Sequence, residues 1–297
     1  MVQSKLVWQS KLVLLLVLPV TGADVVLEAH WWAVNSLPLA IWTVGLSLLL
    51  GIVAFKLRSA TAGAAVAGAF ITASLMFSTA VAPYQPWNTA IVPVFTVLVL
   101  TALTTRLGRA KKESMGLAEK RQGRTAAQVA ANLGFSAIVS CGIVESFVID
   151  SRWFAPTGLA PIPILVPMLA ALCEAAADTV SSEIGQVFGG RPIMITSLRR
   201  VDPGTDGGLS LAGTLAGLLA AGLVAMAGAV SIVPHNPALA AAAWGGGVFG
   251  LLFDSLLGAT LERQGWLNND LVNFLSTASA SGFALMLLSL IPHASVG

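Results

Sequence analysis

The residues best suited to chemistry lie close together in the second half of this 297-residue chain. Glu174 and Asp178 are four residues apart at the end of a long apolar run, a spacing that puts both carboxylates on one face of a helix. Glu183 follows, and then the adjacent arginines Arg199 and Arg200. Carboxylates suit a hard cation and arginines suit a phosphate. This order of residues predicts a site for a metal ion together with a phosphate compound.

A turn-rich loop follows the two arginines. Residues 203–208 read Pro-Gly-Thr-Asp-Gly-Gly and lead directly into another apolar helix, which Ser210 is placed to cap. Such a loop exposes successive backbone N–H groups, and a helix N-terminus favours a phosphate. It is not a P-loop, because no lysine follows the glycines. The loop residues expected to bind nucleotide or substrate are Gly204, Thr205, Gly207 and Gly208.

A basic segment at residues 109–132 is the second candidate. It carries six Lys and Arg residues, and Gln128 and Asn132 then sit four residues apart where a membrane helix begins. A positively charged cytoplasmic loop accounts for the charges but not for two amides that enter the membrane. We therefore favour anion binding over a plain loop. The candidates in this segment are Lys112, Glu113, Arg124, Gln128 and Asn132.

The third candidate is an acid inside an apolar helix. Asp254 lies about two turns within the expected helix end. A charged side chain in a membrane costs several kcal/mol unless it has a partner, and a divalent cation shared with Asp178 would supply one. A polar contact between helices is the alternative. Asn268 or Asn269 is expected to cap the next helix, and Asn269 and Asn273 are further candidates for substrate or nucleotide binding.

The composition shows what must position these residues. The chain is 56% hydrophobic and 10% charged, with a mean hydropathy of +0.83, whereas a soluble domain carries roughly 25% charged residues. An all-α, polytopic membrane protein is therefore predicted. The net charge of +2 does not indicate a nucleic-acid partner. Cys141 and Cys173 lie in apolar runs, where buried thiols are expected instead of a disulfide. Glycines four residues apart predict close helix packing at Gly213 and Gly217, and at Gly246 and Gly250.

Eight or nine membrane helices are expected. The first segment, 12–27, is either a signal peptide cleaved near Ala23 or a short first span, and we favour the span. Residues 1–106 would hold the N-terminal helices, and residues 107–291 the polar segments and five membrane helices. The remaining spans are expected at 37–56, 60–82, 87–106, 127–149, 159–179, 209–233, 238–261 and 271–291.

The cations set the expected orientation. With nine spans, fifteen of the sixteen Lys and Arg residues fall on one side of the membrane, and Arg152 is the exception. The positive-inside rule makes that side cytoplasmic, together with the N-terminus and all three polar segments. The histidines fall at the other face, so Mg²⁺ held by carboxylates is the expected metal. Its expected ligands are Asp178, Glu174, Glu183 and Asp254. The expected location is a bacterial inner membrane or its equivalent.

Five sequence motifs resemble a known family of integral membrane proteins whose function was formerly unknown. The family includes plant phytyl-phosphate kinase of the vitamin E pathway and animal transmembrane protein 19. The matching motifs are residues 111–132, 177–185, 199–214, 253–262 and 268–281. The resemblance implies a membrane kinase that moves a phosphoryl group from a nucleoside triphosphate, with CTP as the expected donor, to an isoprenoid monophosphate such as phytyl phosphate.

In this interpretation Asp178 and Asp254 bind Mg²⁺, while Lys112, Arg124, Arg199 and Arg200 hold the phosphates. The acceptor phosphate is already anionic at neutral pH, so a general base is not needed. One rival is a transporter or flippase of a phosphorylated lipid or small anion. Another is a structural membrane protein. The polar residues gather on one face and no internal repeat is convincing, and both points favour the enzyme.

Overall fold

The computed structural model describes residues 6–81, 83–119, 121–142, 144, 165–232 and 236–291. Expectations for Lys5, Lys120, Arg152, His235 and His293 concern residues outside these ranges. The same holds for the far end of the expected span 127–149 and the beginning of the span 159–179.

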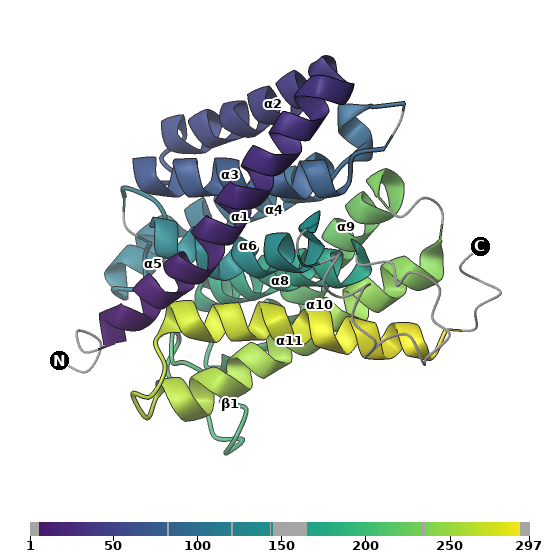
Figure 1. The fold of residues 1–297 in the computed structure, drawn as a ribbon. Helices are drawn as coiled ribbons and strands as arrows, with labels where there is room; N and C mark the ends of the chain where they lie inside the picture. The colour runs from purple at the N-terminus through teal and green to yellow at the C-terminus, as the bar shows by residue number, and fades with distance from the viewer. Residues whose placement is uncertain are drawn as a thin grey trace.

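Within the described ranges the chain is a bundle of long helices (Figure 1). Six helices are long and apolar enough to cross a membrane, and three shorter ones are also apolar. The prediction of a polytopic helical protein is confirmed. The long helices are α1 (Val7–Asn35), α2 (Leu37–Lys56), α8 (Leu165–Phe188), α9 (Leu211–Ser231), α10 (Pro237–Leu257) and α11 (Asn269–Ser289). The shorter apolar helices are α3 (Ala62–Ser78), α4 (Ile91–Arg106) and α6 (Ala126–Ser140). A further short polar helix is α5 (Arg109–Ser114), and a 3₁₀ turn, η2, covers Pro86–Asn88.

The first helix is longer than the short span expected at 12–27. It has 29 residues and crosses the bundle obliquely, packing on α2, α3, α6 and α11 (Figure 1). Its first turns extend beyond the apolar run because they are hydrogen-bonded to the segment before α11. Gln9 donates to the carbonyl of Trp266 at 2.8 Å, and Asn268 donates to Ser10 at 2.9 Å. These polar contacts hold a helix end that hydropathy alone does not reveal.

The helix α8 forms the centre of the bundle. In the most apolar 18-residue stretch of α8, 78% of the residues are buried. In the corresponding stretches of the other five long helices the share is 28–44%. It packs against α4, α6, α9, α10 and α11. The carboxylates of Glu174, Asp178 and Glu183 are therefore carried by the most buried of the six long helices.

Small residues allow the neighbours of α8 to approach closely. A Cβ atom added at Gly213 would lie 2.6 Å from the carbonyl oxygen of Ser181, and one added at Gly246 would lie 2.6 Å from that of Ala280. The prediction of close packing at the glycine pairs is confirmed. Gly250 makes room for the acidic site, since its Cβ would lie 2.5 Å from Cγ of Glu174.

The contact at Gly250 gives a first testable prediction. Gly250→Ala is expected to lower the free energy of unfolding by about 1–3 kcal/mol, because the added methyl group overpacks the α8–α10 interface. Gly282→Ala is the matched control, since nothing lies within 4 Å of a Cβ at this position of α11. Thermal unfolding in detergent measures both. Equal stability of the two variants would contradict the packing described for α10.

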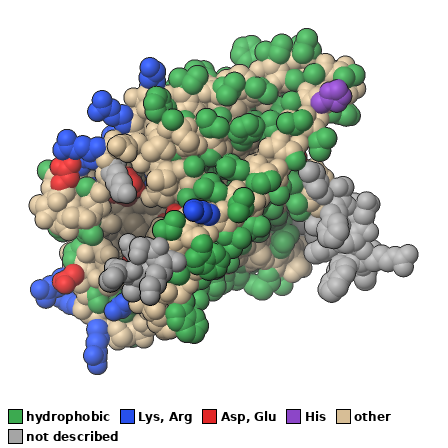
Figure 2. Space-filling view, turned by 60° about the vertical axis from the view of Figure 1, so that its left-hand side comes forward, with side chains coloured by type: hydrophobic (Ala, Val, Ile, Leu, Met, Phe, Trp, Pro, Cys, Tyr) green, Lys and Arg blue, Asp and Glu red, His purple; other side chains and the backbone are tan. Residues whose placement is uncertain are grey.

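The connections that carry the polar motifs meet at one end of the bundle, because successive helices run in alternating directions (Figure 1). Segments 57–61 and 107–125 are joined directly: the N–H of Arg124 donates to the Ser59 carbonyl at 3.1 Å, and that of Thr61 to the Arg124 carbonyl at 3.0 Å. Lys and Arg side chains gather at one end of the surface in Figure 2, and hydrophobic side chains cover most of the rest. The polar segments therefore converge, as their order along the chain predicts.

Two local features of this end were not expected from the sequence. Ile193–Met194 (β1) pairs antiparallel with Gly208–Leu209 (β2), so the loop between them forms a short hairpin in an otherwise helical protein. The helix α10 continues into a π-helical turn, η4 (Gly258–Glu262). Such turns occur often at functional sites. Hydropathy detects neither feature, because both are short.

Cys141 and Cys173 are both buried and do not form a disulfide with each other, which confirms the expectation for the two cysteines.

Candidate functional site

A polar cavity of about 310 Å³ opens at the end of the bundle where the polar segments meet. Its walls come from α6, α8, α10, α11, η4 and the loop 203–208. Twelve of the residues singled out in the sequence line it: Arg124, Gln128, Asn132, Asp178, Glu183, Gly204, Thr205, Gly207, Gly208, Asp254, Asn269 and Asn273. The cavity therefore brings together residues from all three polar segments.

A cluster of carboxyl groups forms the deepest part of the site. Asp178 of α8 and Asp254 of α10 line the cavity and lie within hydrogen-bonding reach of each other. Glu174 lies one turn deeper on α8, is 1% exposed and accepts a hydrogen bond from Ser276 at 2.7 Å. One oxygen of Glu174 and Oδ1 of Asp254 are buried without a partner among the described residues. Two orphaned carboxylate oxygens beside a third acid call for a cation or protons.

Arg124 is a positive charge that lies close enough to Asp178 to interact with its carboxylate. Its guanidinium donates to the hydroxyl group of Thr179 at 3.2 Å, and Thr179 follows Asp178 on α8 and also lines the cavity. Gly123 fixes the approach of this segment: it has φ +82°, and its Cβ would lie 2.5 Å from the backbone of Ser59. A residue with a side chain cannot occupy this place without displacing the connection before α3.

The loop 203–208 closes the cavity from the side of the hairpin. Gly207 has φ +77°, and its Cβ would lie 2.4–2.6 Å from Ala259, so the loop rests backbone to backbone on the π-helical turn. Gly204 has φ +81°, and its Cβ would lie 2.4 Å from the side chain of Leu117. Ser210 caps α9, as expected, by accepting a hydrogen bond from Gly213 N–H at 3.1 Å. The glycines are thus required for close approach of the loop to its neighbours.

The amide side chains divide into two groups. Gln128 forms a capping box with Thr125, whose N–H donates to the Gln128 side chain at 2.7 Å. This structural role explains the polar entry to α6 that we assigned to anion binding. Asn132 and Asn273 are buried in the cavity wall, where Asn273 donates to Asn132 at 3.4 Å. Asn268 is the cap of α11, while Asn269 is exposed and lines the cavity.

Lys112 is bonded to groups of the protein itself, and not available to a phosphate as we expected. It is 1% exposed, and its ammonium group donates to Glu183 at 2.5 Å and to the carbonyls of Thr104 and Thr105 at 3.1 and 2.7 Å. All three hydrogens of the ammonium group are thus engaged. The pair satisfies the last turn of α4 and ties it to α8. Glu183, which we expected to assist a metal, has its charge neutralised by this lysine.

This buried ion pair gives a second prediction. Lys112→Met is expected to lower the free energy of unfolding by about 3 kcal/mol, because it leaves the Glu183 carboxylate without its partner. Adding Glu183→Gln to the same chain should restore part of the loss, since the unpaired charge is then removed. Lys56→Met, at an exposed lysine, serves as the control. A single Lys112→Met variant as stable as the control would refute the pairing.

Besides Lys112 and Glu174, three of the expected site residues do not line the cavity. Arg199 and Arg200 are exposed on the hairpin and do not line it. Glu113 is on α5, where it pairs with Arg109 at 3.0 Å and Arg121 at 3.5 Å. The hydrogen bond from Arg109 holds the pKa of the Glu113 carboxyl below its usual range. Of the expected cations, only Arg124 faces the cavity.

Two acids that sequence reasoning passed over belong to the site. Glu262, the last residue of the π-helical turn, lines the cavity. Asp206 lies at its mouth, where desolvation raises the pKa of the carboxyl group and the nearby Arg263 opposes that shift. The signal was present in the motifs, since Asp206 stands inside the Pro-Gly-Thr-Asp-Gly-Gly loop. Both acids were overlooked because neither interrupts an apolar run.

The donor set fits a hard cation in part. Carboxylate oxygens are the ligands that Mg²⁺ prefers, and two of them are orphaned at the cavity floor. Within the described part of the chain, however, no three His, Cys, Asp or Glu side chains are arranged as a ready ligand cluster. Mg²⁺ keeps several waters and is commonly held by one or two carboxylates together with substrate phosphates. Asp178 and Asp254 satisfy that requirement.

The fold and the cavity together define a class: a multi-pass helical membrane protein with an acidic and arginine-bearing cavity where its helices end. The family model for integral membrane protein DUF92 matches residues 45–281. The chain therefore belongs to this integral membrane family, as the five motifs indicated. All the residues that form the cavity fall within the matched range.

Three curated relatives are similar to parts of the chain. The protein VTE6, chloroplastic, of Arabidopsis thaliana is 30% identical over 194 residues, which is 64% of this chain and 55% of the plant protein. An uncharacterized membrane protein of Methanocaldococcus jannaschii is 40% identical over 113 residues, 38% of this chain and 47% of the relative. An uncharacterized membrane protein of Synechocystis is 31% identical over 193 residues, 61% of this chain and 67% of the relative. The chain spans about half the length of the first two. No solved structure matches.

Proposed function

We propose that this protein is a membrane kinase that transfers a phosphoryl group from a nucleoside triphosphate to an isoprenoid monophosphate. One observation carries the proposal: Asp178 and Asp254 meet at the floor of a cavity in which Arg124 faces the same acids. The resemblance to the family of plant phytyl-phosphate kinase supports it, as does the similarity to a chloroplast protein. CTP is our expected donor.

The reaction has few chemical demands. An oxygen of the acceptor monophosphate forms a bond to the γ-phosphorus, the bond from that phosphorus to the β–γ bridging oxygen breaks, and the nucleoside diphosphate leaves. The acceptor oxygen is anionic at neutral pH, so no proton has to be removed from it. The protein must instead position two phosphate groups in line and offset their repulsion.

The residues of the cavity divide this task. Arg124 neutralises phosphate charge with a guanidinium group that binds phosphate oxygens in pairs. The loop 203–208 lines the cavity and is held in shape by its contact with η4, so it would form the wall against which the phosphates lie. Asp178 and Asp254 would hold Mg²⁺, with Glu174 supporting them from below. Mg²⁺ bound there would supply charge neutralisation for the triphosphate.

We place the cavity on the cytoplasmic side of the membrane. The connections that form its mouth carry most of the described cations, among them Arg58, Arg106 and Arg263. The positive-inside rule assigns such connections to the cytoplasm, where nucleoside triphosphates are present. In this orientation a membrane-bound acceptor reaches the cavity from the bilayer, and the donor reaches it from water.

Donor and metal dependence test the proposal. Purified protein in detergent is supplied with phytyl monophosphate and each of the four nucleoside triphosphates, with Mg²⁺, with Ca²⁺ or with a chelator. We expect transfer with Mg²⁺, the highest rate with CTP, and none with the chelator. If the folded protein transfers phosphate from no donor, but proteoliposomes containing it move a phosphorylated lipid across the bilayer, the transporter interpretation replaces the kinase.

A further inference from the structure

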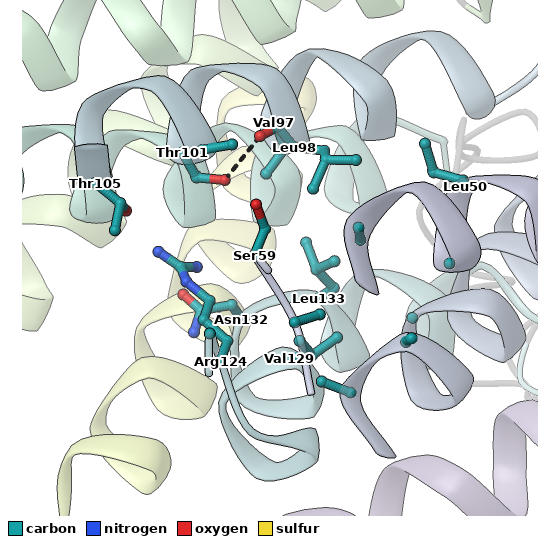
Figure 3. A pocket seen from close by; sticks show the side chains of 18 of the residues that line it. Leu50, Ser59, Val97, Leu98, Thr101, Thr105, Arg124, Val129, Asn132 and Leu133 are labelled. Atoms are coloured by element: carbon teal, nitrogen blue, oxygen red, sulfur yellow. Dashed lines mark hydrogen bonds between the residues drawn. The ribbon is translucent and has the colours of Figure 1, made fainter. Parts of the chain in front are cut away.

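A second cavity, of about 130 Å³, lies beside the polar one among α2, α3, α4 and α6. Figure 3 shows Arg124 and Asn132 at one end of it, Leu50 at the other, and Leu98 and Leu133 between. Its lining is mostly apolar, with the side-chain hydroxyl groups of Ser59 and Thr101 near the end that holds Arg124. The cavity therefore changes from polar to apolar along its length.

The two cavities meet at shared residues. Glu119, Arg124 and Asn132 line both of them. The guanidinium of Arg124 is held at this junction by Thr179, and its backbone is fixed by Ser59. A ligand can therefore place its anionic group at Arg124, next to the acids of the polar cavity. The rest of the same molecule can then extend into the apolar cavity.

Small side chains keep the apolar cavity open. Gly68 of α3 lines it, and a Cβ added there would meet only Cγ1 of Val129, at 3.7 Å. Ala64 and Ala65, on the same helix, also line it. Interiors are close-packed, and an unfilled cavity is destabilising. Apolar cavities exclude water and accept apolar ligands. A row of small residues beside a phosphate-binding arginine is therefore suited to hydrocarbon.

We propose that the apolar cavity holds the hydrocarbon chain of the acceptor, whose phosphate lies at Arg124. The proposal rests on the proposed function and adds a specific position for the substrate to it: between α3, α4 and α6, away from α9 and α10. The first isoprene units pass Asn132 and Leu133, and later units extend toward Leu50. The depth of the cavity at Gly68 then determines how well a long chain binds.

A size substitution tests this position. Gly68→Leu fills the cavity, so kcat/KM for a 20-carbon prenyl monophosphate should fall by about 10-fold or more, while that for a 5-carbon prenyl monophosphate stays within about 3-fold. Gly45→Leu is the control, since this glycine of α2 is exposed, does not line the cavity and has nothing within 4 Å of its Cβ. An equal loss for both chain lengths would overturn the proposal.

Photolabelling of the unmodified protein gives a second readout that does not depend on turnover. A 20-carbon prenyl monophosphate with a diazirine at its far end is irradiated with the protein in lipid nanodiscs, and the labelled peptides are mapped. We expect the label on residues 50–54 and 94–98, at the end of the cavity away from Arg124. Unlabelled prenyl monophosphate should protect these residues, and phosphatidic acid should not. Label on α9, α10 or α11, or equal protection by phosphatidic acid, would contradict the proposal. Label in the expected place without phosphotransfer would refute the kinase and leave the chain-binding cavity standing.

Discussion

Asp178→Asn is expected to reduce phosphotransfer by at least about 100-fold, a loss typical of removing one electrostatic group from an active site. The carboxylate of Asp178 is within hydrogen-bonding reach of Asp254, which itself has a buried oxygen without a partner. An amide has nearly the same shape but supplies no negative charge, so the pair can no longer hold a divalent cation. Turnover of purified protein at saturating donor and acceptor measures the effect.

The fold should survive this substitution. Removing one charge from a buried group of acids relieves repulsion, so the unfolding temperature should stay the same or rise. Asp202→Asn is the matched control, because Asp202 is exposed and does not line the cavity. Turnover in Asp178→Asn equal to that in Asp202→Asn would refute the assignment of the acidic pair to catalysis.

Arg124→Gln is expected to lower kcat/KM for the acceptor by about 100-fold, because phosphate loses a charge-assisted, paired contact. Arg124→Lys should restore only part of the rate, since an ammonium group cannot reproduce the planar fork of the guanidinium. The backbone bonds from residue 124 to Ser59 and Thr61 do not depend on its side chain. The variants should therefore remain folded, which thermal unfolding can verify.

Arg121→Gln is the control for this series. Arg121 stands three residues earlier, is 83% exposed and contacts only Glu113 among the ion pairs of the described residues. A general effect of positive charge on the loop that carries Arg121 and Arg124 would reduce activity in both variants alike. Such an equal reduction would show that Arg124 acts through the charge of the loop and not through contact with the acceptor.

Much of this arrangement could be predicted from the sequence. Long apolar runs determine the helices, and burying Asp178 or Asp254 in a membrane is too costly to occur without a partner. Both residues do line one cavity, together with Asn273 from the same segment as Asp254 and Asn132 from the basic segment. Because successive membrane helices alternate in direction, counting them was sufficient to predict that these segments lie at the same end of the bundle. Such inferences succeed because they depend on the membrane and not on side-chain detail.

Side-chain pairing could not be predicted in the same way. Lys112 and Glu183 are 71 positions apart, and only packing of α5 against α8 shows that they neutralise each other. The sequence around Gln128 is compatible with a capping box and with a binding site. Only the contact with Thr125 in the structure shows that it forms the capping box. Arg199 and Arg200 were expected at the phosphates, but the β1–β2 hairpin leaves them exposed. Hydropathy shows where a charge is costly and not which partner it meets.

If this membrane protein makes an isoprenoid diphosphate, analysis of its products will show it. Purified protein in lipid nanodiscs is given phytyl monophosphate, Mg²⁺ and CTP labelled in its γ-phosphate. We predict a lipid diphosphate that carries the label, formed in step with CDP and absent with Asp178→Asn. Intact CTP and an unlabelled lipid, with protein shown to be folded, would contradict the account.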